Sequence, residues 1–497
     1  MTSLPRLLPV ATVALAALAP AFARAEPSSK RPPNIVFILI DDMGWKDISP
    51  NGSGYYRTPH LEKLAAEGIR FTQGYAPAAV SSPSRAALLT GKAPQRLHVT
   101  DWIPGDMNSA YAPKSKDRRF DNPDWTMRLR PEETTLAEVL KTRGYATVSI
   151  GKWHLGGDDA DGDGPRNHGF DENHGGGHPG QPASYFWPYG KPKDRHRVPG
   201  LSDAGGKEGE YLTDRLTDEA IKFIDANKTK PFFIYLPHYA VHGPLGAKKV
   251  DIESFKGVPA DGKQNSPLYA AMVKSVDESV GRINARIKEL GLEKDTIIVF
   301  TSDNGGVTNY PGHTSNAPLR AQKGFPYEGG LRVPLIVKMP GVARPGSVSD
   351  TPVIGTDFFP TFVKLAGAPA AASAPGIDGV DILPALRGGK LSRDTFVWHF
   401  PHYWGGGVIT PYSAIRVGDW KLVRWYEFDA VELYNLAKDP YEKTDLASKE
   451  PSKLKELAAK LDAHLRAQGA QMPKPKKNPD PARDPATNKA HANPLFL

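Results

Sequence analysis

The sequence predicts an α/β fold with a mainly parallel sheet covered by helices and a second, smaller domain. Residues 34–42, NIVFILIDD, and residues 296–304, TIIVFTSDN, each contain a continuous apolar run rich in Ile and Val. Such runs are typical of parallel strands buried on both faces. Helical stretches alternate with strands of this kind, and we expect these helices at 61–67, 135–143, 212–227 and 268–290.

The smaller domain follows a change in composition near Thr395. Short aromatic-rich runs, FVWHFPHYW, YSAIRVGDWKLVRWY and VELYNL, indicate an antiparallel sheet. Residues 452–467 have the spacing of an amphipathic helix. We therefore place the main domain at 33–386, the small α+β domain at 395–470 and a disordered tail at 471–497, where Pro, Lys, Asn and Asp predominate.

The first 25 residues resemble a signal peptide. Arg6 supplies a positive charge, residues 7–21 are almost wholly apolar, and Ala23-Arg24-Ala25 has the form of a cleavage site. The apolar stretch is short for a membrane span. We expect an exported protein, periplasmic or secreted, with no stable membrane span.

Composition fits a large globular enzyme, with 39% hydrophobic and 24% charged residues in a chain of 497. The chain has no Cys, which excludes disulfides and a Cys nucleophile. Its net charge of +8 comes from basic residues interleaved with acidic ones. We therefore expect an anionic substrate rather than nucleic acid.

Polar residues follow both apolar runs directly. Asp41 and Asp42 come after the first run, and Asp303 and Asn304 after the second. Ligand sites of open α/β sheets lie beyond the carboxyl ends of the strands. Four oxygen ligands favour Ca²⁺, with Mg²⁺ as the alternative, over zinc.

The most informative motif is residues 81–91, SSPSRAALLTG. Pro83 restricts the backbone, Ser84 is a candidate helix cap, and the apolar residues after Arg85 predict a buried helix. The positive end of that helix would face Ser81 and any bound anion. Arg85 would add positive charge beside it.

Three further segments supply cations. Residues 146–156, ATVSIGKWHLG, predict a strand followed by Lys152 and His154, which share a side if the segment stays extended. His242 follows the apolar segment at 231–237, and Lys323 precedes a glycine-containing turn. Each of these residues alone is commonly structural.

Together, these motifs resemble those of the type I sulfatases, in the same order along nearly all of 33–386. The resemblance implies the alkaline phosphatase-like fold and oxidation of Ser81 to formylglycine (3-oxoalanine) by a maturation enzyme. This residue is more often Cys in the family. It also implies that Asp41, Asp42, Asp303 and Asn304 bind Ca²⁺, which contacts the modified residue 81.

The same resemblance assigns roles to the cations. Lys152, His242 and Lys323 would contact the sulfate or the leaving oxygen, and His154 would orient the hydrated formylglycine. A protonated Lys323 or His242 would be the general acid. Lys152 and Arg85 would neutralise the equatorial oxygens.

Long irregular stretches at 92–131 and 156–210 are expected to border the site. Candidate substrate-binding residues, chosen because aromatic and charged side chains suit a sugar, are Arg96, His98, Asp101, Trp102, His399 and His402.

The sequence thus predicts a calcium-dependent sulfatase acting on a sulfated carbohydrate or other sulfate ester, with removal of sulfate from terminal sugars. Two alternatives stay open: a phosphate or phosphonate ester hydrolase of the same superfamily, and a non-catalytic glycan-binding relative if Ser81 is unmodified.

Overall fold

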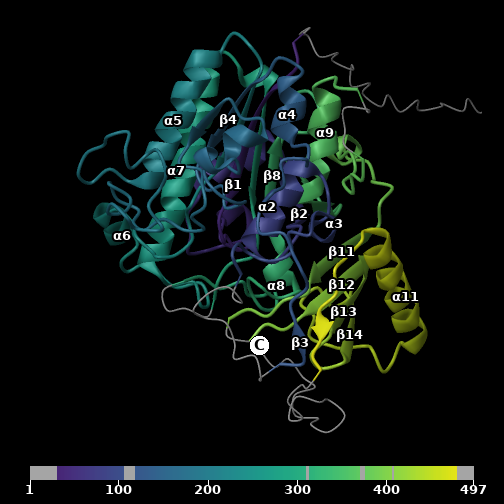
Figure 1. Ribbon diagram of the computed structural model, residues 1–497. Helices are drawn as coiled ribbons and strands as arrows, with labels where there is room; N and C mark the ends of the chain where they lie inside the picture. The colour runs from purple at the N-terminus through teal and green to yellow at the C-terminus, as the bar shows by residue number, and fades with distance from the viewer. Residues whose placement is uncertain (1–30, 106–117, 309–312, 370–374, 406–407, 478–497) are drawn as a thin grey trace, which may run out of the picture.

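A computed structural model describes residues 31–105, 118–308, 313–369, 375–405 and 408–477 (Figure 1). Within these residues the main sheet has the strand order β10-β2-β8-β7-β1-β6-β4-β5, with β9 beside β2. Strand β8 is antiparallel to both of its neighbours, and the other pairs are parallel. The strands are β1 (Asn34–Ile40), β2 (Ile69–Tyr75), β4 (Ala146–Ile150), β5 (Glu172–His174), β6 (Phe232–Pro237), β7 (Thr296–Ser302), β8 (Arg332–Lys338), β9 (Ser347–Ser349) and β10 (Val353–Ile354).

Strand β1 shows why the sheet carries helices on both faces. Its alternate residues enter two different cores, Ile35 and Phe37 on one face and Val36 and Ile38 on the other. The core containing Val36 is closed by α1 (Pro59–Glu67), α5 (Leu212–Asn227), α6 (Lys249–Ser254) and α7 (Pro267–Glu289). The opposite core is closed by α2 (Ser81–Thr90), α3 (Pro94–Leu97), α4 (Leu136–Lys141), α9 (Phe358–Leu365) and α10 (Leu383–Leu386).

The small domain is a four-stranded antiparallel sheet with one long helix. The strands, in spatial order, are β11 (Thr395–Phe400), β12 (Tyr412–Val417), β13 (Trp420–Trp425) and β14 (Ala430–Asn435). One face packs on α11 (Pro451–Ala467) through residues such as Ile415 and Leu461. The other face packs on the main domain, where Trp398 and Val423 share a core with Ala79 and Val80. The small sheet is therefore anchored next to the start of α2.

Most elements agree with the sequence expectations. The predicted mainly parallel sheet flanked by helices and the separate antiparallel sheet are both confirmed. The four helical stretches correspond to α1, α4, α5 and α7, with ends shifted by no more than two residues. Helix α4 begins after Thr135, whose side chain accepts a hydrogen bond from the Glu138 backbone N–H in a capping box.

The tail differs from expectation at its start. Residues 474–475 form β15, which pairs with β3 (Phe120–Asp121), and the Gln471 carbonyl accepts a hydrogen bond from His399. The first residues of the tail therefore make contacts with the rest of the molecule. The remainder of the predicted tail and the predicted signal peptide lie outside the described residues.

The short connecting elements complete the architecture. The helix α8 (Glu328–Leu331) leads directly into β8, and 3-10 turns occur at Ser49–Asn51, Asp159–Asp161, Pro165–His168, Glu293–Asp295 and Gly355–Asp357.

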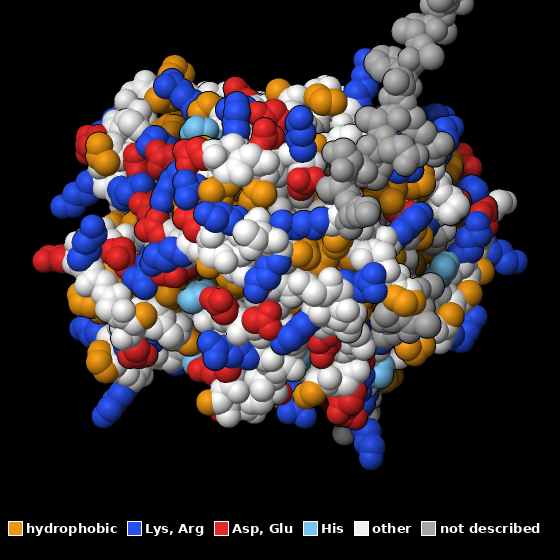
Figure 2. Space-filling view, turned by 90° about the horizontal axis from the view of Figure 1, so that it is seen from above, with side chains coloured by type: hydrophobic (Ala, Val, Ile, Leu, Met, Phe, Trp, Pro, Cys, Tyr) orange, Lys and Arg blue, Asp and Glu red, His pale blue; other side chains and the backbone are white. Residues whose placement is uncertain are grey.

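In the face seen in Figure 2, Lys and Arg side chains are interspersed with Asp and Glu. Among the described residues, no helix combines the length and apolar character needed to cross a membrane.

Candidate active site

The pairing of β1 with β7 builds the centre of the site. Ile40 lies opposite Ser302, so the two residues after each strand leave the sheet side by side. The Asp42 backbone N–H donates to Asp303 Oδ1 at 3.2 Å, and Asn304 Nδ2 donates to Asp42 Oδ1 at 2.8 Å. All four side chains are buried. The predicted meeting of Asp41, Asp42, Asp303 and Asn304 thus occurs at the carboxyl edge of the sheet.

Ser81 lies at the first turn of α2 and points at this cluster. Its Oγ is 3.3 Å from Asp41 Oδ1, from Asn304 Oδ1 and from Lys152 Nζ. The preceding residue, Val80, is extended and provides no side-chain cap. The N-terminal N–H groups of α2, which carry a partial positive charge, are therefore close to the Ser81 side chain.

Ser84 does not cap the helix, in contrast to the sequence expectation. Its hydroxyl donates to the Ala78 carbonyl at 2.9 Å, and Ala78 N–H donates back to Ser84 Oγ at 3.0 Å. Ser84 already lies within the first helical turn, where its side chain reaches the incoming chain rather than the helix N–H groups. It therefore fixes the segment that precedes Ser81.

Arg85 is fully buried behind Ser81. Its Nε and Nη2 donate to Asp303 Oδ2 at 2.9 and 2.7 Å, and Nη1 donates to the Lys152 carbonyl at 2.9 Å. Nη2 also lies 3.6 Å from Asp41 Oδ1. The guanidinium thus joins α2 to the ends of β1, β4 and β7.

Lys152 and His154 follow β4 but face different partners. Lys152 Nζ donates to Asp41 Oδ2 at 2.8 Å. His154 adopts a positive φ of 55°, so the segment does not stay extended as the shared-side argument required. Its Nε2 lies 2.6 Å from the Ile103 carbonyl and must donate to it, which leaves Nδ1 unprotonated and, among the described residues, without a partner. Burial, followed by the charge of Lys152, holds the pKa of His154 well below its usual value.

Lys323 and His242 both approach Asp42. Lys323 Nζ is 2.7 and 2.9 Å from the two Asp42 oxygens, and His242 Nε2 is 3.5 Å from Asp42 Oδ2. Burial lowers the pKa of Lys323, but the carboxylates of Asp42 and Asp41 outweigh it and raise this pKa. Burial lowers the pKa of His242 to about 3, although Asp42 opposes the shift.

The donor set fits a divalent cation. Asp41, Asp42 and His242 each offer a ligand atom, and these atoms lie within 4.8 Å of one another. Burial raises the pKa of Asp41 to about 7, although Lys152 opposes the shift. The three buried carboxylates are those of Asp41, Asp42 and Asp303, and their charges balance those of Arg85, Lys152 and Lys323. No net positive charge is then left to bind an anionic substrate. A divalent ion would supply the missing charge.

Comparison with known proteins identifies the family. The sequence profile of the Sulfatase family matches residues 33–368, and the profile "N-sulphoglucosamine sulphohydrolase, C-terminal" matches residues 321–471. The chain belongs to the sulfatase family. Its relatives are named sulfatases, and the protein is a sulfuric ester hydrolase.

Two curated relatives of the sulfatase cover most of its length. N-acetylgalactosamine-6-sulfatase of Mus musculus is 35% identical over 414 residues, which span 80% of this chain and 72% of the relative. A protein named Sulfatase from Formosa agariphila is 32% identical over 517 residues, spanning 90% of each chain. The crystal structure of Ps i-CgsB has a TM-score of 0.74 at 28% identity, covering 89% of this chain and 95% of the other.

Four of the substrate-binding candidates in the sulfatase make contacts that hold the fold together. Arg96 forms two hydrogen bonds with Asp378, at 2.9 and 2.8 Å, and His98 Nε2 lies 3.0 Å from the Gly469 carbonyl. The buried His399 bonds Ser413 through Nδ1 and the Gln471 carbonyl through Nε2, and the buried His402 bonds Thr100. These contacts do not join the four side chains to the Ser81 cluster.

Asp101 and Trp102, in contrast, lie next to the site. The following residue, Ile103, donates its N–H to Ser82 Oγ and accepts from His154. Asp101 is fully buried and accepts the Trp102 backbone N–H. The Trp102 indole nitrogen is buried without a hydrogen bond to any described residue.

Two supports of His154 were not predicted from the sequence. One is the Ile103 carbonyl described above, and the other is Gly180, where a Cβ atom would lie 2.6 Å from two atoms of the imidazole ring. Only the absence of a side chain at Gly180 leaves room for His154. The run GGGHPG was a signal of such a close approach.

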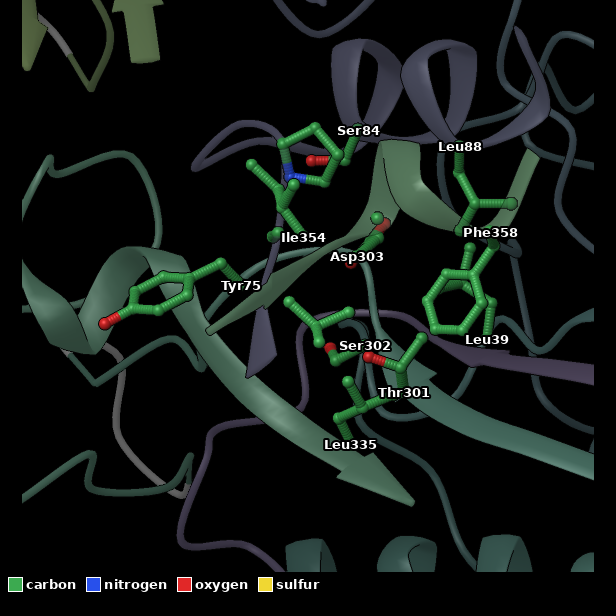
Figure 3. Close-up of a pocket in the computed structure, with 14 residues that line it drawn as sticks. Leu39, Tyr75, Ser84, Leu88, Thr301, Ser302, Asp303, Leu335, Ile354 and Phe358 are labelled. Carbon is green, nitrogen blue, oxygen red and sulfur yellow. The ribbon is translucent and has the colours of Figure 1, made fainter. Parts of the chain in front are cut away.

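A small cavity lies behind the site in the sulfatase, between α2 and the sheet (Figure 3). It is lined by residues including Asp303, Ser84, Leu88 and Phe358 and measures about 10 Å³. This is the size of one water molecule. Substrate therefore does not bind there.

Proposed function

We propose that this sulfatase releases sulfate from a sulfated carbohydrate, using formylglycine formed from Ser81 together with Ca²⁺. The observation that carries the proposal is the position of Ser81 Oγ, 3.3 Å from the oxygens of Asp41 and Asn304 and from Lys152 Nζ. An oxidised and hydrated side chain at this position would offer one hydroxyl for attack on sulfur, and loss of a proton from the other would expel sulfate.

The surrounding side chains have distinct roles in this proposal. Lys152 holds positive charge beside the attacking oxygen, and Arg85 fixes the frame by binding Asp303. His154 Nε2 donates to the Ile103 carbonyl, which leaves Nδ1 as the atom that would accept the proton whose loss expels sulfate. Lys323 and His242 approach from the Asp42 side, where the leaving oxygen would lie.

Ca²⁺ would be held by Asp41, Asp42, Asp303 and Asn304, with residue 81 as a further ligand. His242 is an additional candidate ligand because its ring nitrogen lies near both Asp41 and Asp42. Oxygen donors of this number suit Ca²⁺ more than zinc. The ion would neutralise the transferring group and favour ionisation of the hydroxyl at residue 81.

A carbohydrate substrate is supported by the relatives. One is named N-acetylgalactosamine-6-sulfatase, and Ps i-CgsB has been crystallised in complex with k-i-k-neocarrahexaose, a structure 29% identical to this chain with a TM-score of 0.73. Action on terminal sugars, a formylglycine-generating partner enzyme and export to the periplasm or medium remain predictions. The phosphonate monoester hydrolase of Agrobacterium radiobacter, at 19% identity and a TM-score of 0.60, shares the fold alone.

The test is mass spectrometry of the tryptic peptide Phe71–Arg85 from protein made in its native host. We expect a peptide lighter by two hydrogens, with the change at Ser81 and a hydrazide-reactive aldehyde. The same preparation should release sulfate from sulfated glycans faster than it hydrolyses phosphodiesters. An unmodified peptide from a preparation that binds sulfated glycans without turnover would instead establish the non-catalytic alternative.

A further inference from the structure

A turn of the small domain reaches the catalytic edge of the main domain. Trp404 and Ile409 exchange backbone hydrogen bonds at 3.0 Å in both directions, which pairs these two residues beyond β11. Ile409 belongs to the core that contains Ala79 and Val80, and Trp404 packs against the same core. The turn is thus fixed beside the segment that leads into Ser81.

The Trp404 ring packs directly against the residue after Lys323. A Cβ atom on Gly324 would lie 2.4 Å from both Cε3 and Cζ3 of the indole, and Gly324 has a φ of +88°. The Gly324 N–H donates to the Ala79 carbonyl at 2.8 Å. A side chain at Gly324 would push the ring away, so this glycine allows the indole to approach the site.

The indole lies beside the lysine that would meet the sulfate ester. Lys323 Nζ is 5.8 Å from the centroid of the Trp404 ring, while the same nitrogen contacts Asp42 at 2.7 Å. A sulfate ester positioned at Lys323 would therefore place its sugar beside the indole. The lysine would meet the ester oxygen, and the aromatic ring would meet the apolar C–H face of the sugar.

The indole has capacity left for a ligand. Trp404 is only partly buried, and its Nε1–H makes no hydrogen bond with the described residues. Val408, on the same turn, is 46% exposed. An indole presents a flat apolar surface and one hydrogen-bond donor, the combination that sugar binding uses.

We propose that Trp404 is a substrate-binding residue that stacks on the sugar carrying the sulfate, with its in-plane indole N–H donating to a substituent that extends past the ring edge. The assignment rests on the proposed carbohydrate substrate and identifies the group that distinguishes a sugar ester from inorganic sulfate. His399 and His402, which precede Trp404 in the same run, are buried in contacts of the fold, whereas Trp404 faces Lys323.

Binding to the full chain with unmodified Ser81, which lacks the formylglycine needed for turnover, gives a direct test. The ligands are methyl N-acetylgalactosaminide 6-sulfate and inorganic sulfate, measured by isothermal titration in calcium. We expect Trp404→Ala to weaken the sugar ester at least about tenfold and Trp404→Phe to weaken it less. Neither change should alter sulfate binding by more than about twofold. Val408→Ala, on the same turn, is the matched control and should bind both ligands as the wild type does.

Three outcomes would overturn the proposal. The first is an unchanged affinity of Trp404→Ala for the sugar ester. The second is an equal loss of affinity for the sugar ester and for inorganic sulfate, which would indicate displacement of Lys323. The third is no binding of the sugar ester by the wild type. Turnover by the matured enzyme is measured separately. If Trp404→Ala loses affinity for the sugar ester while the matured wild type releases no sulfate, that pair of results would reject the proposed function and still support Trp404 as a sugar-binding residue.

Discussion

Arg85 donates two hydrogen bonds to a single carboxylate oxygen of Asp303, at 2.9 and 2.7 Å, with both side chains inaccessible to solvent. The pair connects the helix that carries Ser81 to the strand end that faces it. Removing one partner would leave a charge buried without compensation.

We therefore expect Asp303→Asn to lower the free energy of unfolding by about 3–5 kcal/mol. Arg85→Lys keeps the charge but loses the fork and the bond to the Lys152 carbonyl, so it should also be destabilised. Urea unfolding followed by circular dichroism measures both. A loss below about 1 kcal/mol in Asp303→Asn would show that the pair contributes little.

Calcium should stabilise the folded chain even before maturation. Its ligands are brought together only in the folded state, so an ion at about 100 times its Kd would add about 2.7 kcal/mol. Differential scanning calorimetry should show a higher Tm with calcium than with EDTA. Asp42→Asn should abolish this difference in Tm. Asp47→Asn, which changes another buried acid in the segment after β1, should retain it. Retention of the full calcium response in Asp42→Asn would remove Asp42 from the ligand set.

The identity of the general acid can be tested with two leaving groups. A sugar alkoxide needs a proton as the bond breaks, whereas 4-nitrophenolate does not. If Lys323 supplies that proton, Lys323→Ala should lose at least about 100-fold in kcat on a sugar sulfate and far less on 4-nitrophenyl sulfate. Lys152→Ala removes the positive charge beside the nucleophile, so its kcat should fall by a similar factor on both substrates.

His242→Ala provides the competing outcome. Burial lowers the pKa of this imidazole to about 3, so we expect it to be neutral. The decrease in kcat of His242→Ala should therefore be the same for both leaving groups. A leaving-group dependence confined to His242→Ala would transfer the acid role from Lys323 to His242.

Asp47 should impose a pH dependence on stability. Its carboxylate accepts hydrogen bonds from Gly44, Gln264 and Tyr269, yet burial raises its pKa from 3.8 to about 7. Between these values the unfolded chain releases the proton and the folded chain keeps it. The stabilisation is therefore complete below about pH 4 and is lost as the pH rises to about 7.

Asp47→Asn cannot ionise and should lack this slope. Relative to the variant, the wild type should lose on the order of 1 kcal/mol or more of unfolding free energy from pH 4 to pH 7. Chemical unfolding across this range measures the difference. Parallel curves for the two proteins would mean that Asp47 ionises normally in the fold.

The amino-acid sequence by itself determined the elements and the order of the reactive groups. Apolar runs such as 34–40 have a single stable environment, between two layers of helices, so the strand and the position of Asp41 and Asp42 beyond it follow directly. The motif at 81–91 likewise predicted a buried helix whose positive end faces Ser81, although the helix begins at Ser81 rather than after Ser84. These features depend on local patterns and were predicted from them.

The tertiary structure alone decided which distant side chains meet. The register of β1 on β7 places Asp41 beside Asp303, and the positive φ of His154 turns its ring to the Ile103 carbonyl. His399 and His402 have the composition of ligand-binding residues, but packing of the small sheet uses their nitrogens internally, while Trp404 reaches Lys323. The contacts within the main domain depend on strand register and loop conformation, and the contact of Trp404 with Lys323 depends on how the two domains are oriented. Both result from the packing of many residues distant in the sequence.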